Sequence, residues 1–194
     1  MATTEPTRTT AVERPAGSRA GWILLSLARI AVGWIFLWTF LDKTFGLGFS
    51  TCRDTESGAV DVGCDATWAS GARMTEGYLG SSSGPLADFY AGLGEQAWTD
   101  WPYMIGLLGI GLALVLGIGT RVAMWAAALM LAMMYTSHAW PGAVYPQQNP
   151  FVDEHIVYIL VVFAAVLLEV RYQAIGLGEW WKRLGAVQKN RWLI

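Results

Sequence analysis

Four polar side chains at the start of one apolar stretch could carry out proton chemistry. Asp153, Glu154 and His155 are consecutive, and Tyr158 follows four residues after Glu154. In a helix, residues four apart share a face, whereas neighbours are rotated by about 100°. At least one of the three consecutive side chains must therefore face inward. A histidine beside carboxylates can take up and release protons near neutral pH.

Two further pairs of polar residues end other apolar stretches. Tyr135 and His138 end the stretch before this one, and Asp42 and Lys43 end the first. If the chain folds so that these ends meet, the cluster could bind a quinone headgroup, with a neighbouring acid setting the protonation of His155. In the structural alternative, the acids only stabilise a first helical turn, where the helix dipole favours negative charge.

Metal and haem binding are also chemically open to these residues. Two histidines with carboxylates can bind a metal ion, and a histidine on each of two helices can ligate a haem. However, the sequence has no H-E-x-x-H motif, and a turn separates His138 from His155. We therefore predict a quinone as the cofactor, with no metal or haem signature.

Arg29 is a charged residue within an otherwise apolar stretch, Ala20–Leu41. A charge at the centre of a bilayer costs about 2.5–3.5 kcal/mol on insertion scales, so such a residue indicates a functional site by default. We expect it to form the floor of a polar cavity and to pair with Ser26, Tyr135, Tyr158 or backbone carbonyls of the Gly-rich stretch that follows. In the alternative, its long side chain extends to the membrane surface.

The composition indicates a membrane protein, since 54% of residues are apolar and 14% are charged, whereas soluble domains have about 25% charged residues. A membrane-spanning helix needs about 20 apolar residues, and four stretches qualify: Ala20–Leu41, Trp101–Gly119, Arg121–Trp140 and Phe151–Val170. The predicted fold is an all-α membrane protein, a four-helix transmembrane bundle over residues 20–172. A disordered tail is expected at 1–19 and an amphipathic tail at 173–194.

The distribution of Lys and Arg predicts the orientation, because cytoplasmic loops carry the excess. Nine of these residues flank the predicted inner ends, whereas the long loop 42–100 holds only Lys43, Arg53 and Arg73. Both termini are therefore predicted to be cytoplasmic, in the plasma membrane of a prokaryote. With a formal net charge of −2 and no basic run interleaved with aromatics, nucleic-acid binding is excluded.

The loop 42–100 contains both cysteines, Cys52 and Cys64. Outside the cytoplasm thiols are usually oxidised, so we predict a structural disulfide. A redox-active dithiol is the alternative, although it would usually have Cys-x-x-Cys spacing.

Later in the loop, residues 81–93 have helix-start signals and apolar residues at helical spacing. They predict a short amphipathic helix on the outer surface, an interfacial anchor or a lid.

The C-terminal segment from Gly178 has apolar residues at roughly helical spacing, opposite basic ones. It predicts a basic amphipathic helix on the inner membrane surface, and a partner-binding helix is the alternative.

Several motifs together resemble one known family. They are Gly33-Trp34-Ile35-Phe36-Leu37-Trp38 running into Leu41-Asp42-Lys43, then Gly84-Pro85-Leu86, the run from Gly106 to Leu114, and Asn149-Pro150-Phe151-Val152-Asp153-Glu154-His155 followed by Tyr158. This pattern resembles the DoxX/DoxD family of four-helix membrane proteins, which includes the membrane subunit of thiosulfate:quinone oxidoreductase.

The resemblance implies electron transfer from a reduced sulfur compound outside the membrane to a quinone within it, together with redox partner subunits. The matching positions are Asp42, Lys43, Asp153 and His155, with Arg29 on the matching first helix. Two alternatives from other classes stay open: a non-catalytic membrane subunit or assembly factor, and a small-molecule transporter. The sequence argues against a transporter, because it shows neither the inverted repeat nor the broken helix pair that transporters use.

Overall fold

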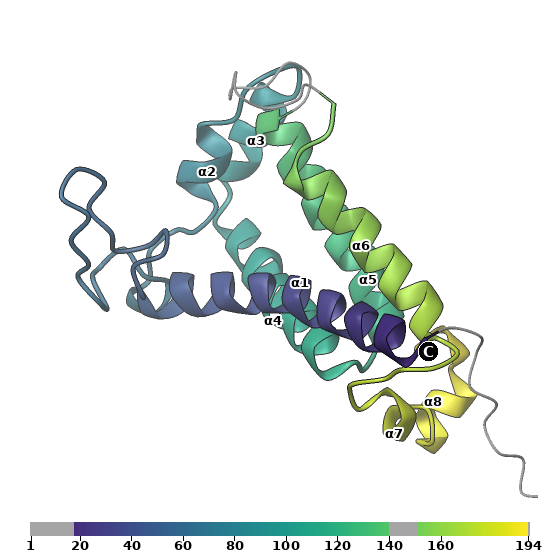
Figure 1. Ribbon diagram of the computed structural model, residues 1–194. Coiled ribbons are helices and arrows are strands. Elements are labelled where there is room, and N and C mark those ends of the chain that lie inside the picture. Colours follow the sequence, from purple (N-terminus) through teal and green to yellow (C-terminus); the bar gives the residue numbers. More distant parts are fainter. Residues whose placement is uncertain (1–17, 140–150, 194) are drawn as a thin grey trace, which may run out of the picture.

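The computed structural model describes residues 18–139 and 151–193, and this part of the chain is helical (Figure 1). The four longest helices are α1 (Arg19–Phe45), α4 (Asp100–Leu116), α5 (Thr120–Met134) and α6 (Glu154–Glu169). Within the described ranges, β pairing is limited to an isolated bridge between Arg53 and Val60. The all-helical prediction is confirmed. Residues 1–17 of the predicted tail and Trp140 lie outside the described residues.

Local sequence explains where these helices begin and end. The Ser18 side chain accepts a hydrogen bond from Gly21 N at the start of α1, and Gly46 ends that helix in the left-handed conformation. Gly117 and Gly119 both have positive φ between α4 and α5. Only glycine adopts that conformation without strain, which permits the tight turn that makes α4 and α5 antiparallel neighbours.

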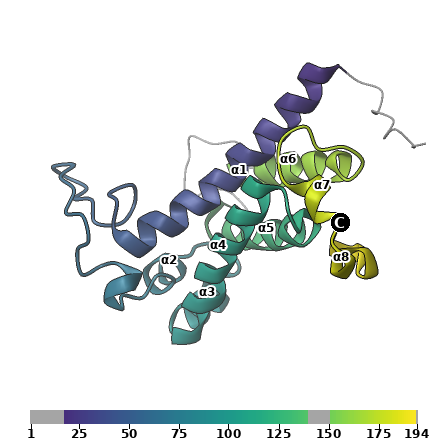
Figure 2. The ribbon, with the colours of Figure 1, turned by 90° about the horizontal axis from the view of Figure 1, so that it is seen from below.

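The four long helices form two pairs, α1 with α4 and α5 with α6, which meet at one end of the molecule and diverge toward the other (Figures 1 and 2). Close approach within the first pair depends on two glycines. A Cβ on Gly33 would lie 2.7 Å from Leu114 Cβ, and one on Gly111 would lie 2.7 Å from Leu37 N. Small residues at such positions let apolar helices pack backbone against backbone.

The buried core draws on all four helices. Its members include Phe36 of α1, Met104 and Leu114 of α4, Leu131 of α5 and Val166 of α6. Large apolar side chains also cover the outward faces of the same helices, among them Leu24, Trp34, Ile105, Trp125 and Leu160. The helices are therefore apolar all round.

Among the described residues, two helical stretches are long and apolar enough to cross a membrane, Arg19–Phe45 and Ala97–Leu116. Helices α5 and α6 have 15 and 16 residues, so both are shorter than the stretches predicted for them. The shortening of α6 has a local cause, because Asp153 caps its first turn and so sets its start three residues after the predicted Phe151. Helix α5 continues into a π-helical turn, Tyr135–Ala139.

The long loop between α1 and α4 carries the predicted disulfide, Cys52–Cys64, with Cα atoms 5.7 Å apart. Two short helices follow, α2 (Glu76–Gly80) and α3 (Ala87–Gly94), which lie across the diverging ends of the two helix pairs (Figure 1). The short helix predicted from Ser81 onward exists, but it begins only at Ala87. Gly84, with φ of +82°, keeps the preceding residues in a turn.

The C-terminal segment differs from the single amphipathic helix predicted for it. It contains α7 (Gly178–Trp181), α8 (Gly185–Lys189) and a final 3₁₀ turn, Arg191–Leu193. The helix breaks at Leu184, whose backbone is extended with ψ of 130°. The break lets Trp181 Nε1 donate a hydrogen bond to Leu193 O at 3.0 Å, and the segment folds back on itself.

Candidate functional site

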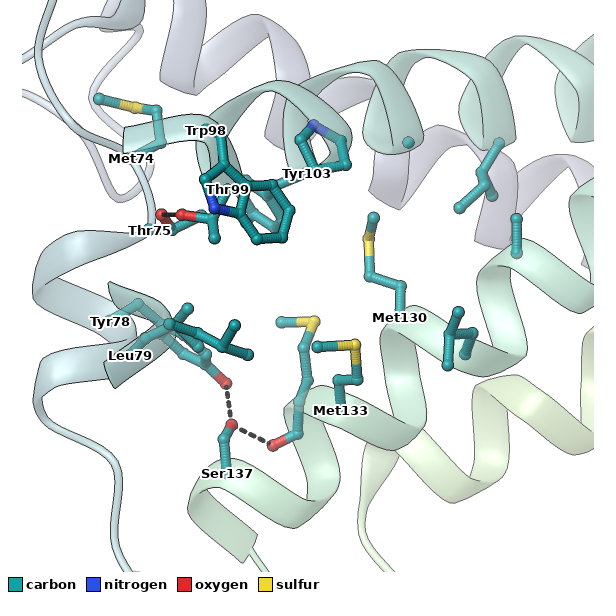
Figure 3. A pocket seen from close by; sticks show the side chains of 17 residues that line it. Met74, Thr75, Tyr78, Leu79, Trp98, Thr99, Tyr103, Met130, Met133 and Ser137 are labelled. Atoms are coloured by element: carbon teal, nitrogen blue, oxygen red, sulfur yellow. Dashed lines mark hydrogen bonds between the residues drawn. The ribbon is translucent and has the colours of Figure 1, made fainter. Parts of the chain in front are cut away.

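A cavity of about 310 Å³ lies between α2, α4 and α5, where the helix pairs diverge (Figure 3). Binding sites for small molecules usually occupy about 300–1,000 Å³, so this cavity is large enough for one ring system. Its walls are almost entirely apolar. We call it the ring pocket; its lining includes Met74, Thr75, Tyr78, Leu79, Trp98, Thr99, Tyr103, Gly106, Ile110, Ala126, Met130, Met133 and Ser137.

Methionine and aromatic side chains form much of the wall. Figure 3 shows Met130 and Met133 opposite Tyr78 and Leu79, with Trp98 and Tyr103 along a third side. Methionine is unbranched and polarizable, so it adapts to irregular ligands and makes favourable contacts with aromatic rings. The pocket is therefore suited to a flat apolar ligand.

Hydroxyl groups and a histidine mark one end of the ring pocket. Ser137 Oγ lies 2.9 Å from Met134 O, 2.9 Å from His138 Nδ1 and 3.4 Å from Tyr78 Oη. The rings of Tyr78 and His138 stack, with centroids 4.2 Å apart. On its far side, His138 Nε2 lies 3.5 Å from the hydroxyl of the exposed Ser81. A chain of polar atoms thus runs from the pocket toward the surface.

The π-helical turn presents these groups. A π turn has more residues per turn than an α-helix. The side chains of Ser137 and His138 therefore point in other directions than a continued α5 would give them. Such single turns occur often at functional sites. A second anchor is the Tyr135 hydroxyl, which donates to Phe151 O at 3.0 Å and so ties the turn to the start of α6.

A buried polar group fixes the α2 side of the pocket. Asp100, at the start of α4, accepts hydrogen bonds from Met74 N, Thr75 N and the Thr75 hydroxyl, and its other oxygen is paired with Arg73 Nε at 2.5 Å. The Thr75 and Thr99 hydroxyls lie 2.7 Å apart. This network holds α2 against α4, and the pocket between them is preformed.

The predicted acidic cluster caps α6. Asp153 Oδ1 accepts from His155 N and Ile156 N, and Asp153 Oδ2 lies 2.6 Å from His155 Nδ1. None of Asp153, Glu154 and His155 lines the ring pocket. Their possible ligand atoms lie within 4.8 Å of one another, which identifies them as residues that could hold a metal ion. However, both oxygens of Asp153 already have partners. Their predicted catalytic role stays a prediction.

The other predicted site residues are dispersed. Fully buried Asp42 accepts hydrogen bonds from Phe49 N, Ser50 N and Thr51 N, and thereby folds the chain back after α1. Lys43 lies in the last turn of the same helix. Tyr158 packs against the apolar core.

Arg29 lies at the opposite end of the molecule from the ring pocket. Its Nε is 2.5 Å from Glu169 Oε2, its Nη1 donates to Leu114 O, and its Nη2 lies 2.5 Å from Ile175 O. The Ser26 hydroxyl donates to the second Glu169 oxygen. The predicted pairing of Arg29 with a carbonyl of the Gly-rich segment is confirmed. The expected partners Tyr135 and Tyr158 are wrong, and Ser26 acts through Glu169.

Sequence reasoning missed both Glu169 and the ring pocket. Glu169 is the single acid in the C-terminal half of Phe151–Val170. An isolated acid in one apolar stretch and an isolated arginine in another could therefore have indicated the pair. Met130, Met133 and Met134 cluster at the end of α5, but methionine spacing of this kind is also usual in a plain core. Ser137 and Tyr78 had no sequence signal.

Comparison of the chain with family models, with curated proteins and with solved structures found no match.

Proposed function

We propose that this chain is the quinone-binding membrane subunit of an oxidoreductase of the DoxX/DoxD type. The observation that supports this best is the ring pocket, an apolar cavity with Tyr78 and Ser137 in its lining and with His138 in contact with both of them. A quinone has a flat ring that prefers apolar walls and two carbonyl oxygens that need hydrogen-bond donors. The pocket offers both in one place.

The polar end also suits the chemistry of quinone reduction. A quinone that accepts two electrons takes up two protons to become a quinol. The His138 imidazole can take up and release a proton, and it lies between Ser137 at the pocket and Ser81 nearer the surface. In the proposed reaction the electrons come from a reduced sulfur compound, delivered on the outer side by a partner subunit.

The proposal places α1, α4, α5 and α6 in the plasma membrane of a prokaryote, with both termini cytoplasmic. Apolar residues on the outward faces support this, such as Trp125 on α5 and Leu160 and Leu167 on α6, which are all more than half exposed. Exposed apolar surface of that extent is a liability in water and normal against lipid. The loop with the disulfide and α2–α3 would face outward.

The first test fills the ring pocket. Met133→Trp should remove quinone from the purified protein, because the larger side chain occupies the space of the ring. Co-extracted quinone is measured by chromatography after purification in mild detergent. Leu160→Trp, on an outward face of α6, is the matched control and should retain quinone. If the wild-type protein and both variants carry equal amounts, the ring pocket is not the quinone site.

The second test removes one hydrogen bond. Ser137→Ala should weaken quinone binding about twofold to twelvefold, because a single hydrogen bond usually contributes about 0.5–1.5 kcal/mol. Thr39→Ala is the control, since its hydroxyl bonds only to Ile35 O on α1. Binding is measured by quenching of tryptophan fluorescence on titration with a quinone. Equal affinities of the two variants would contradict a role for Ser137.

The leading alternative is a non-catalytic membrane subunit. Arg29 favours a structural contribution at the inner end, because the atoms of its guanidinium are bonded to protein groups. Addition of thiosulfate to the native complex distinguishes the two functions. If the bound quinone becomes reduced, the oxidoreductase function is supported. His155→Ala in the same assay tests whether the α6 cluster takes part in that reduction. Bound quinone that stays oxidised favours the alternative.

A further inference from the structure

A second cavity, of about 490 Å³, continues from the ring pocket along α4 and α5. The two cavities share Gly106, Ile110 and Ala126 as lining residues. Since these three come from both helices, the cavities adjoin along one α4–α5 face. We call the second cavity the tail groove; beyond the shared residues it is lined by Gly109, Ala113, Val122, Ala123, Trp181 and Trp192, among others.

Small residues keep the tail groove open. A Cβ on Gly109 would meet nothing within 4 Å, whereas a Cβ on Gly106 would come 2.6 Å from Met130 Cε. The Met130 side chain therefore packs against Gly106 where the two cavities adjoin, whereas Gly109 borders empty space. A larger residue at position 109 would fill that space.

Length and lining both suit an extended chain. Ten helical residues separate Tyr103 in the ring pocket from Ala113 in the groove, about 15 Å at 1.5 Å per residue. At its far end the groove reaches Trp181 and Leu193 of the folded-back C-terminal segment, which are tied to each other by a hydrogen bond. The lining of the tail groove is as apolar as that of the ring pocket, but the groove has no polar end like the one at Ser137 and His138.

We propose that the tail groove holds the prenyl tail of the quinone whose ring occupies the ring pocket. This inference rests on the proposed function and narrows its substrate class to long-tailed prenyl quinones. The occupant follows from continuity, because an apolar chain attached to a ring in the ring pocket would extend along the α4–α5 face past Gly106 and Ile110, which line both cavities. The C-terminal segment then acts as the end wall that limits how far the tail extends.

The test compares two quinones on three proteins. The full chain is reconstituted in phospholipid nanodiscs and titrated with a ubiquinone that carries a single prenyl unit and with one that carries a long prenyl tail. The proteins are wild type, Gly109→Leu and Gly92→Leu. Gly92 is a matched control because a Cβ there also meets nothing within 4 Å, although it lies on α3 outside the groove. Ratios between proteins cancel the partition of each quinone into lipid.

Gly109→Leu should weaken binding of the long-tailed quinone about tenfold, because the leucine side chain would occupy the space of the tail and the two would have to pack against each other with strain. The short-tailed quinone should bind all three proteins equally. If Gly109→Leu leaves the long-tailed affinity unchanged, or weakens both quinones alike, the tail does not occupy the groove. A change of oligomeric state in Gly109→Leu would instead identify the groove as a contact between copies. If wild type binds neither quinone, the proposed function itself fails.

Discussion

At the scale of single residues, the buried ion pair between Arg29 and Glu169 connects the most elements. Neither side chain is more than 3% exposed. Burial of two charges is costly, and their attraction offsets that cost only if the remaining polar atoms are also bonded. Here Ser26, Leu114 and Ile175 supply the additional partners. The ion pair therefore joins α1, α4 and α6 and the segment after α6 at one point.

Removal of one partner should be more harmful than removal of both. Arg29→Met or Glu169→Leu alone leaves an uncompensated buried charge and should lower the free energy of unfolding by about 3–5 kcal/mol. The double variant should lose much less than the sum. Denaturant unfolding in detergent measures the free energy of unfolding of the two single variants and of the double variant.

The control is Glu179→Ala, which breaks the more exposed ion pair with Lys182 and should cost less than about 1 kcal/mol. Additive losses in the double variant would contradict coupling of the two charges.

At the scale of elements, the molecule depends on how closely α1 and α4 approach. The Gly33 and Gly111 contacts allow that approach, and Asp100 then holds α2 against the beginning of α4. The ring pocket forms on the other face of α4, against α5. Its shape is therefore set by two helix pairs that are tight at the Arg29 end and apart at the Ser137 end.

Gly111→Ala tests this packing. Its Cβ would lie within 2.7–2.9 Å of three Leu37 atoms, two of them backbone atoms. Overpacking of this kind costs about 1–3 kcal/mol, and we expect a loss of that size in thermal unfolding monitored by circular dichroism. Gly109→Ala is the matched control on the same helix, because it borders open space, and it should be neutral or slightly stabilising. If both variants unfold alike, α1 and α4 are not packed backbone to backbone.

At the scale of the whole molecule, the proposed membrane topology accounts for the arrangement of polar and apolar surface. The described loop after α1 carries the disulfide and the short helices, whereas α7 and α8 lie at the end of the molecule where α1 begins and α6 ends (Figure 1). A bilayer around the four long helices would separate these two polar regions.

Labelling from one side of the membrane tests that topology. In intact cells of a Cys-free variant, a single cysteine introduced at Glu56 should react with an impermeant maleimide. Cysteines at Arg171 and Gln188 should react only after the membrane is opened. Equal labelling of all three positions in intact cells would contradict the four-span arrangement.

The sequence by itself determined the helical class, the approximate positions of the four long helices and the Cys52–Cys64 disulfide. These follow from local properties: apolar runs, caps, glycine turns and the count of cysteines. It also identified Arg29 as a residue in need of a partner. The candidate site was less predictable. Two of the residues grouped from their place at the ends of apolar stretches instead bond to nearby backbone: Asp153 caps α6, and Asp42 accepts hydrogen bonds from residues 49–51 in the loop after α1.

Only the tertiary structure decided which distant residues meet. Tyr78, Ser137 and His138 come together because α2 is held across the diverging helix pairs and because α5 ends in a π turn. Glu169 reaches Arg29 because α1 and α6 are antiparallel, so that the start of α1 lies beside the end of α6 (Figure 1). Such contacts depend on helix crossing, on rotation about each helix axis and on the close approach that glycines allow. A periodic apolar pattern specifies a helix, but when all its faces are apolar it leaves the orientation of that helix undetermined.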